Sequence, residues 1–428
     1  MESSLVSPVL SLYVHVPFCA RKCQYCAFYS EVAEAGVMER YVTALLRELE
    51  LVAHDLQPGT VYFGGGTPSL LPVREWERIF RAMDRLGLLG AAEWTIECNP
   101  ATVSLEKARC WRGAGVNRVS LGVQSLHDPL LERLGRVHSR QAVFDSFDLL
   151  RRGGFDNLGL DLMFAIPGQT RAIWRDTLRE ALALGGEHLS SYEVIYEDDT
   201  PLFDQLEAGR FDVDEDLACD MYEDLVDAAA AHGFQQYEVA NFARHRLPDP
   251  PNPSSSRRKE APISLGNELA HGDESLLTSA PTDLHIISEV PNLACRHNLN
   301  YWRGGSFYGL GPSATSYVRG VRTKNFANTT VYCGHLETGC RAIESQEELP
   351  PLARAGETAA FGLRMTVGWP YQAFKQTTGF DLREHWADAI KSLVERGWAR
   401  TDEERFQLTA QGLRFADAAA QEFLITGC

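Results

Sequence analysis

The sequence lacks the features that would place it in a membrane, in an oxidising compartment or on nucleic acid. No run of apolar residues reaches the ~18 needed for a membrane-spanning helix. Cysteine is sparse, with 10 in 428 residues, which excludes a disulfide scaffold and favours a reducing compartment. Positive charge is in deficit, because 41 Lys and Arg residues stand against 58 Asp and Glu residues. The formal charge of −17 argues against broad nucleic-acid binding.

The first residues show neither a basic region before an apolar stretch nor an Arg-rich amphipathic presequence. We therefore expect a cytoplasmic protein without a transmembrane segment. Hydrophobic residues make up 44% of the chain and charged residues 23%, close to the averages of soluble domains, so a sizeable core can form without disulfides. The sequence favours neither a monomer nor a dimer.

Short apolar runs alternate with stretches of helical periodicity in the first half of the chain. Strands are expected at residues 10–16, 60–63, 94–98, 118–123, 157–164 and 189–194. Helices are expected between them, at residues 38–54, 73–86, 104–113, 142–152 and 172–184. Because strand and helix alternate, the sequence predicts an α/β protein whose parallel sheet closes into a partial (β/α)6 barrel.

The later part of the chain differs in composition. Residues 246–293 contain 7 of the 20 prolines and no aromatic residue, so we expect a disordered insertion there. Helices are predicted at residues 214–232 and 381–397, and a hairpin at 398–408 turns at 402–404 before a closing helix. This order predicts a smaller, mostly helical and winged-helix-like C-terminal domain. The expected divisions are residues 1–245, 246–293, 294–350 and 351–428.

Three cysteines, Cys19, Cys23 and Cys26, follow the first predicted strand directly. Three thiolates can hold three irons of a 4Fe-4S cube, which leaves the fourth iron open to an amine and a carboxylate. Taken alone, the spacing leaves open a zinc site with a distant fourth ligand, or buried free cysteines. The strand before the thiols and the aromatic Tyr25 beside the last one favour the cluster.

A glycine-rich turn, residues 64–68, follows the second predicted strand. Glycines allow backbone N–H groups to approach a ligand that a Cβ would block. The turn has no Lys-Ser/Thr pair, so it is not a Walker loop, and such turns often have no role beyond the turn itself. Beside the thiols, it fits a cradle for the amine and carboxylate of an amino-acid cofactor.

Together these motifs resemble the oxygen-independent coproporphyrinogen III oxidase-like radical SAM family. The matching stretches are residues 13–19, the three cysteines, and residues 64–68, 122–125, 161–170, 237–244 and 297–302. The resemblance therefore covers most of the chain except the insertion, and it implies that the predicted barrel is a radical SAM barrel.

The resemblance implies a 4Fe-4S cluster on Cys19, Cys23 and Cys26, with S-adenosylmethionine on the open iron. It also implies which residues contact S-adenosylmethionine: Tyr13, Tyr25, Gly65, Gly66, Thr67, Glu97, Gln124, Arg136 and Asp161. Their chemistry suits the ligand, since carboxylates can bind ribose hydroxyls or an ammonium group and Arg136 can pair with a carboxylate.

Two branches of the family remain open, a decarboxylating coproporphyrinogen oxidase and a heme chaperone. The oxidase branch has Gly-Cys after the third cysteine, whereas Cys26 is followed here by Ala27. The chaperone branch carries a His-Asn-x-x-Tyr-Trp motif, which is present as His297, Asn298, Tyr301 and Trp302. A histidine can ligate heme iron and aromatic rings can face the macrocycle, although these residues could also simply cap a turn and pack the core.

We therefore favour a heme chaperone, which binds heme and passes it to acceptor proteins such as respiratory hemoproteins. The oxidase is the alternative. The other cysteines have no ligand-like spacing and read as small buried or terminal residues. Cys295 is the exception, because it lies two residues before His297 and is expected to come near a bound heme.

Overall fold

The computed structural model describes residues 7–32, 34–246 and 289–424. All six expected strands are present and lie in one parallel array: β1 (Val9–Val16), β4 (Leu56–Gly65), β5 (Glu93–Cys98), β6 (Arg118–Gln124), β7 (Leu158–Phe164) and β8 (His188–Glu193). Most of their side chains are buried, as expected when helices cover a parallel sheet. The predicted α/β barrel is confirmed.

Three strands that the sequence did not predict extend the sheet to nine. Strand β11 (Tyr308–Leu310) pairs with β1 in parallel, while β10 (Asn241–Ala243) runs antiparallel to β8 and pairs with β9 (Gln235–Glu238). The full order is β11-β1-β4-β5-β6-β7-β8-β10-β9. Segments more than two hundred residues apart in the chain thereby become neighbours in the sheet.

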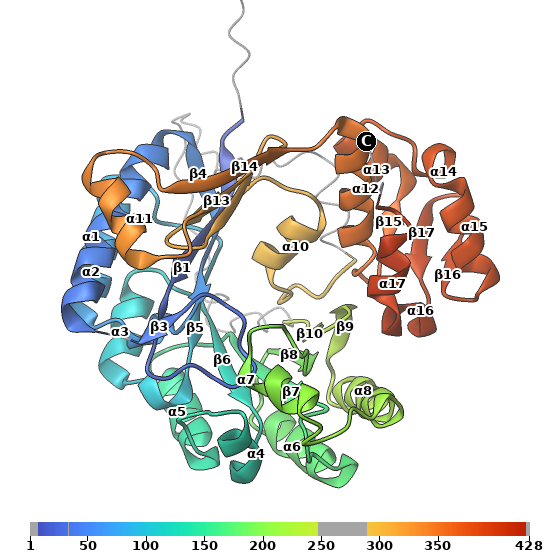
Figure 1. Ribbon diagram of the computed structural model, residues 1–428, viewed down its shortest axis with the longest axis horizontal. Helices are drawn as coiled ribbons and strands as arrows, with labels where there is room; N and C mark the ends of the chain where they lie inside the picture. The colour runs from blue at the N-terminus through green and yellow to red at the C-terminus, as the bar shows by residue number, and fades with distance from the viewer. Residues whose placement is uncertain (1–6, 33, 247–288, 425–428) are drawn as a thin grey trace, which may run out of the picture.

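Helices cover the outer face of the barrel (Figure 1). They are α1 (Ala35–Val52), α2 (Val73–Arg85), α3 (Leu105–Gly113), α4 (Asp128–Arg133), α5 (Arg140–Arg152), α6 (Arg171–Ala183) and α8 (Glu215–Ala231). The α7 helix (Pro201–Glu207) follows β8. Short 3-10 turns lie at Ala53–Asp55, Pro68–Leu70 and Pro100–Thr102, and a small parallel pair joins β2 (Phe18–Cys19) to β3 (Glu31–Val32). The barrel strands share one hydrophobic core with α1, α2, α3, α5, α6 and α8, whereas α4 and α7 contribute to a separate cluster.

Residues 289–350 return to the barrel. Helix α10 (Arg296–Trp302) lies on the inner side of the sheet, between the barrel and the C-terminal helices (Figure 1). A second sheet follows, made of β12 (Thr315–Val318), β13 (Val321–Asn325) and β14 (Ile343–Glu348), with α11 (Thr329–Glu337) packed on α1. The greater part of the predicted insertion, residues 247–288, lies outside the described residues.

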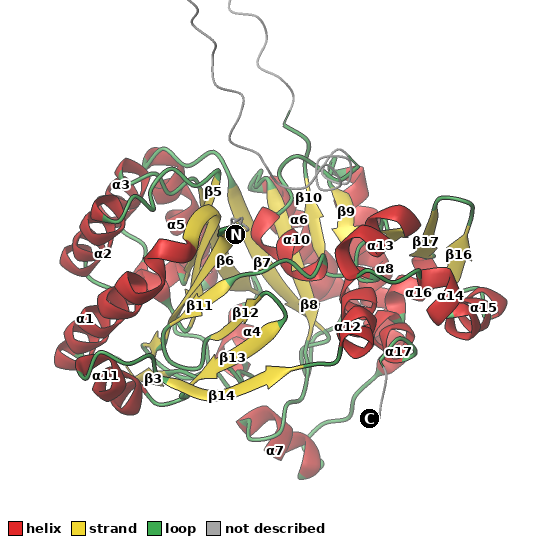
Figure 2. Cartoon of the chain, turned by 90° about the horizontal axis from the view of Figure 1, so that it is seen from above, coloured by secondary structure: helices red, strands yellow, loops and turns green. Residues whose placement is uncertain are grey.

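The C-terminal part forms its own core at one side of the barrel (Figure 2). It contains α12 (Pro351–Gly362), α13 (Tyr371–Thr378), α14 (Leu382–His385), α15 (Ala387–Glu395), α16 (Ala410–Arg414) and α17 (Ala416–Gln421). A three-stranded sheet, β15 (Trp369–Pro370), β17 (Arg405–Leu408) and β16 (Ala399–Thr401), supplies the predicted hairpin. The domain boundaries themselves stay a prediction.

One predicted helix, at residues 381–397, is wrong in detail. The chain leaves the helix at Trp386, whose backbone has φ −124° and ψ 31°, so that α14 and α15 are separate. The buried Trp386 indole donates to the Phe423 carbonyl at 3.1 Å, a tertiary contact that periodicity does not reveal. Within the described residues, no helix combines the length and the apolar character that crossing a bilayer requires.

Candidate functional site

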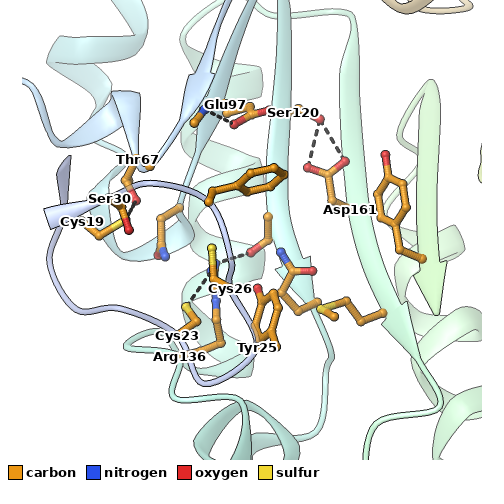
Figure 3. Close-up of a pocket in the computed structure, with 18 of the residues that line it drawn as sticks. Cys19, Cys23, Tyr25, Cys26, Ser30, Thr67, Glu97, Ser120, Arg136 and Asp161 are labelled. Atoms are coloured by element: carbon orange, nitrogen blue, oxygen red, sulfur yellow. Dashed lines mark hydrogen bonds between the residues drawn. The ribbon is translucent and has the colours of Figure 1, made fainter. Parts of the chain in front are cut away.

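A cavity of about 500 Å³ opens where β4, β5, β6 and β8 end (Figure 3). Most of the site residues expected from the sequence line this one cavity: Cys19, Cys23, Tyr25, Cys26, Gly65, Gly66, Thr67, Glu97, Gln124, Arg136 and Asp161. Residues scattered over almost 150 positions meet because the carboxyl ends of parallel strands lie at the same end of a barrel.

Cys19 ends the short strand β2, Cys23 and Cys26 lie on the loop that follows it, and all three are at the cavity wall. Each is half-buried and none is in a disulfide. The Thr67 hydroxyl donates to the Cys19 sulfur at 3.6 Å, and the Arg136 guanidinium donates to the Cys23 sulfur at 3.6 Å. Donors of this kind stabilise thiolates, the form in which sulfur binds iron. The loop thus presents three sulfur ligands to one open space.

The spacing of the three cysteines also left a zinc site open. Across residues 7–32, 34–246 and 289–424, no three His, Cys, Asp or Glu side chains lie together in a way that would hold a single metal ion. A structural zinc site needs four such ligands around one ion. A four-iron cube, by contrast, takes one thiolate at each of its separate corners.

The glycine-rich turn is bound to the cysteine loop. The Gly66 N–H donates to the Val16 carbonyl at 2.8 Å, and the Thr67 N–H donates to the Phe18 carbonyl at 2.7 Å. A Cβ on Gly66 would lie 2.8 Å from both of these carbonyl oxygens, so only glycine fits. The N–H groups of Gly66 and Thr67 therefore fasten the turn to the chain that carries Cys19, while a cradle for an amino-acid cofactor at this turn stays a prediction.

Two half-buried carboxylates face the cavity. Glu97 accepts from the Tyr62 hydroxyl at 2.7 Å and from the Gly65 N–H at 3.2 Å, and burial raises the pKa of Glu97 to about 7. Asp161 accepts from the Ser120 hydroxyl through both oxygens, at 2.9 and 3.0 Å, and burial raises its pKa as well. Both carboxylates can bind hydroxyls or a cationic group in the cavity.

Arg136 supplies a cation opposite these carboxylates. Its guanidinium donates to the Gly122 carbonyl at 2.8 Å, while its buried Nε has no hydrogen-bond partner among the described residues. A buried donor without a partner is costly, and an anionic ligand group would satisfy it. Three thiols, two carboxylates and this donor are the chemistry that a 4Fe-4S cluster with bound S-adenosylmethionine requires, so the residues present fit the group.

The structure places His297 away from solvent, in the floor of the barrel. Its side chain is 1% exposed, and burial lowers its pKa to about 3, so the imidazole is neutral. Nδ1 lies 3.0 Å from the Thr60 hydroxyl, and Nε2 lies 2.7 Å from the Tyr301 hydroxyl. Because Thr60 donates its own proton to Ser11, we assign the imidazole proton to Nδ1. The Nε2 lone pair then accepts from Tyr301.

The expected heme residues do not all gather at one surface. Only Asn298 reaches the wall of the cavity, while His297, Tyr301 and Trp302 are not among its lining residues. Cys295 is fully buried, with its sulfur 3.5 Å from a Glu93 oxygen. Tyr13 also lies behind the wall, where its hydroxyl is 3.1 Å from His15 Nδ1.

The cavity residues that sequence reasoning missed include Tyr62, Arg118, Ser120 and Tyr192. A signal existed for two of them. Arg118 and Ser120 alternate along a predicted strand with Gly122 and Gln124, which places all four on the inner face. Arg118 is 2% exposed, and its charge opposes the effect of burial on both carboxylates.

Comparison with known proteins agrees with this site. Residues 13–181 match the radical SAM superfamily and residues 349–415 match the HemN C-terminal domain. Among solved structures, coproporphyrinogen III oxidase (HemN) from Escherichia coli, a radical SAM enzyme, has a TM-score of 0.76 at 20% identity. The match covers 97% of this chain and 90% of that one. The fold and the site thus define a radical SAM protein.

Closer sequence relatives are heme chaperones named HemW. The Bacillus subtilis protein is 30% identical over 97% of this chain and 99% of its own length. The Mycobacterium tuberculosis protein is 31% identical over 96% of this chain and 94% of its own length. The Synechocystis protein is 33% identical over 83% of this chain and 78% of its own length. The chain belongs to the HemW family of radical SAM proteins.

Proposed function

We propose that this protein is a heme chaperone, which holds a 4Fe-4S cluster and S-adenosylmethionine and transfers heme to acceptor hemoproteins in the cytoplasm. The observation that carries the proposal is full-length similarity to HemW proteins combined with an intact His297 motif, defined as His297, Asn298, Tyr301 and Trp302. Fold similarity to HemN alone supports either branch of the family.

Within this proposal, Cys19, Cys23 and Cys26 hold the cluster. Glu97, Asp161, Gln124 and Arg136 orient S-adenosylmethionine, and the two bound groups together supply one-electron chemistry. The protein's own residues bind and orient these groups. Arg136 contributes twice, since its guanidinium contacts the Cys23 sulfur and keeps a free Nε–H for an anionic group.

Heme binding is assigned to the His297 motif on helix α10. In the structure, the Nε2 lone pair that iron needs accepts a hydrogen bond from Tyr301. Ligation therefore requires Tyr301 to turn away and the imidazole to leave its buried position. Asn298 lines the cavity. Within this proposal, heme reaches helix α10 from the cavity side, past Asn298.

The test uses protein reconstituted anaerobically with iron and sulfide. Hemin is titrated into the wild type, into His297→Ala and into a matched control, His188→Ala. His188 is equally buried and its Nε2 also lies 2.7 Å from a phenol, that of Tyr237. We expect loss of hemin binding in His297→Ala only. In parallel, coproporphyrinogen III is supplied with a reductant and S-adenosylmethionine. Release of carbon dioxide and protoporphyrinogen IX would replace the chaperone proposal with the oxidase.

A further inference from the structure

Tyr62 connects the His297 motif to the cofactor cavity. Its ring stacks on the His297 imidazole, with centroids 5.1 Å apart and planes 26° from parallel. Its hydroxyl donates to Glu97 at 2.7 Å. One half-buried side chain on β4 therefore contacts both the imidazole assigned to heme and the carboxylate assigned to S-adenosylmethionine.

The imidazole in this arrangement is held firmly. Thr60 and Tyr301 engage its two nitrogens, so the ring has one orientation in the barrel floor. The centroid of the Tyr13 ring, on β1, lies 6.2 Å from that of the Tyr62 ring and 6.4 Å from that of the His297 ring. Tyr13 therefore packs beside both rings. Aromatic packing of this kind leaves the Tyr62 ring little freedom to turn, and its hydroxyl is fixed with it.

The consequence falls on Glu97. Its carboxylate has two donors, the Tyr62 hydroxyl on one oxygen and the Gly65 N–H on the other, both from β4. Without the Tyr62 hydroxyl, the Glu97 carboxylate would keep only the longer hydrogen bond from the Gly65 N–H, at 3.2 Å. Hydrogen bonds to charged groups are worth more than neutral ones, so this phenol sets where Glu97 points.

We propose that His297 and Tyr62 are positioning residues of the S-adenosylmethionine pocket: the imidazole fixes the Tyr62 ring, and the Tyr62 hydroxyl orients Glu97 toward the cofactor. The inference rests on the proposed function in taking S-adenosylmethionine as the occupant of the cavity. It gives the His297 motif a second role, which is exercised while the imidazole is buried.

The proposal has a signature in the pH dependence of binding. Charged and titratable groups face Glu97 from four strands: Asp161 on β7, Arg118 on β6, Tyr13 on β1 and Tyr192 on β8, besides Tyr62 on β4. Burial raises the pKa of Glu97 to about 7, and the Tyr62 hydrogen bond works against that rise. Loss of the phenol therefore raises the pKa of Glu97. As the pH is lowered, Glu97 becomes protonated at a higher pH in the variant than in the wild type.

The experiment measures the affinity of the cluster-loaded protein for S-adenosylmethionine between about pH 6 and about pH 9. Tyr62→Phe keeps the ring and removes only the hydroxyl. Tyr332→Phe is the control, because the Tyr332 hydroxyl likewise donates at 2.7 Å to a carboxylate, that of Glu48, and both residues are fully buried outside the cavity. Tyr62→Phe should weaken binding about tenfold near pH 7 and shift the midpoint of the pH profile upward.

His297→Ala tests the first link without touching Glu97. It should weaken S-adenosylmethionine binding by about threefold with the same direction of pH shift, whereas His188→Ala should bind like the wild type. Unchanged affinity and pH profile in both Tyr62→Phe and His297→Ala would overturn the proposal. Failure of the wild type itself to bind S-adenosylmethionine would instead remove the proposed function, so the two failures are distinguishable.

Discussion

The carboxylate of Glu93, at the start of β5, accepts a hydrogen bond from the backbone N–H of His297 at 3.0 Å. Its other oxygen accepts from the neighbouring N–H of helix α10 at 2.9 Å, so one buried side chain caps the helix that carries the His297 motif. Free N–H groups at a helix start need such a partner, and a negative charge there is favourable.

We expect Glu93→Ala to loosen helix α10. Removing the carboxylate leaves two N–H groups without acceptors and should lower the free energy of unfolding by about 1–3 kcal/mol. Hydrogen exchange followed by mass spectrometry should show faster exchange in residues 296–302. Unchanged exchange there, with a normal unfolding midpoint, would show that Glu93 does not hold the helix.

Tyr301→Phe should increase hemin affinity. The change removes the hydrogen bond that occupies His297 Nε2, and such a bond is worth roughly 1 kcal/mol, which corresponds to about fivefold in affinity. An absorbance titration with ferric hemin measures the change. The gain should vanish in the double variant with His297→Ala, and a gain that persists there would mean that iron is ligated elsewhere.

Gly66→Ala should prevent stable cluster assembly. The added Cβ would meet the Val16 and Phe18 carbonyl oxygens at 2.8 Å and push the cysteine loop away from the turn. Gly59→Ala, on the strand β4 that ends just before Gly66, is the control, because its Cβ would meet only one atom, at 3.8 Å. Iron content and cluster absorbance after reconstitution should fall in Gly66→Ala alone.

Glu97→Gln should stabilise the protein at alkaline pH while weakening S-adenosylmethionine binding. The pKa of Glu97 rises from 4.5 in the unfolded chain to about 7 in the folded one. The folded state therefore loses stability as pH rises from 4.5 through 7, by up to about 3 kcal/mol. Thermal unfolding without S-adenosylmethionine should favour the variant near pH 8 and show little difference near pH 5. Equal differences at both pH values would contradict the assigned pKa.

Much of the barrel could be predicted from sequence because its strands are largely buried on both faces and several stand out as apolar runs, as at residues 158–164. The three-residue strand β11 could not, since it contains Gly309 and is defined only by pairing with β1, almost three hundred residues earlier. Trp386 likewise interrupts a periodic helix for the sake of a contact with Phe423.

The residues of the site also fall into those that the sequence predicts and those that only the structure reveals. Motif residues at strand ends, such as Glu97 and Asp161, meet in the cavity because the barrel brings strand ends together. The burial of His297 could not be read from its motif, since it depends on Thr60 from β4 and on Tyr301 one helical turn further along. Tyr62 had no motif at all, and its role emerges only from the two contacts it makes.

The most direct test of the assigned cofactor site is the paramagnetic resonance spectrum of anaerobically reconstituted, reduced protein, recorded with and without S-adenosylmethionine. We expect the signal of a reduced 4Fe-4S cluster in the wild type, a change in that signal when S-adenosylmethionine binds the open iron, and no signal in Cys23→Ser. A colourless wild type without this signal, despite supplied iron and sulfide, or one that holds stoichiometric zinc instead, would contradict the assignment.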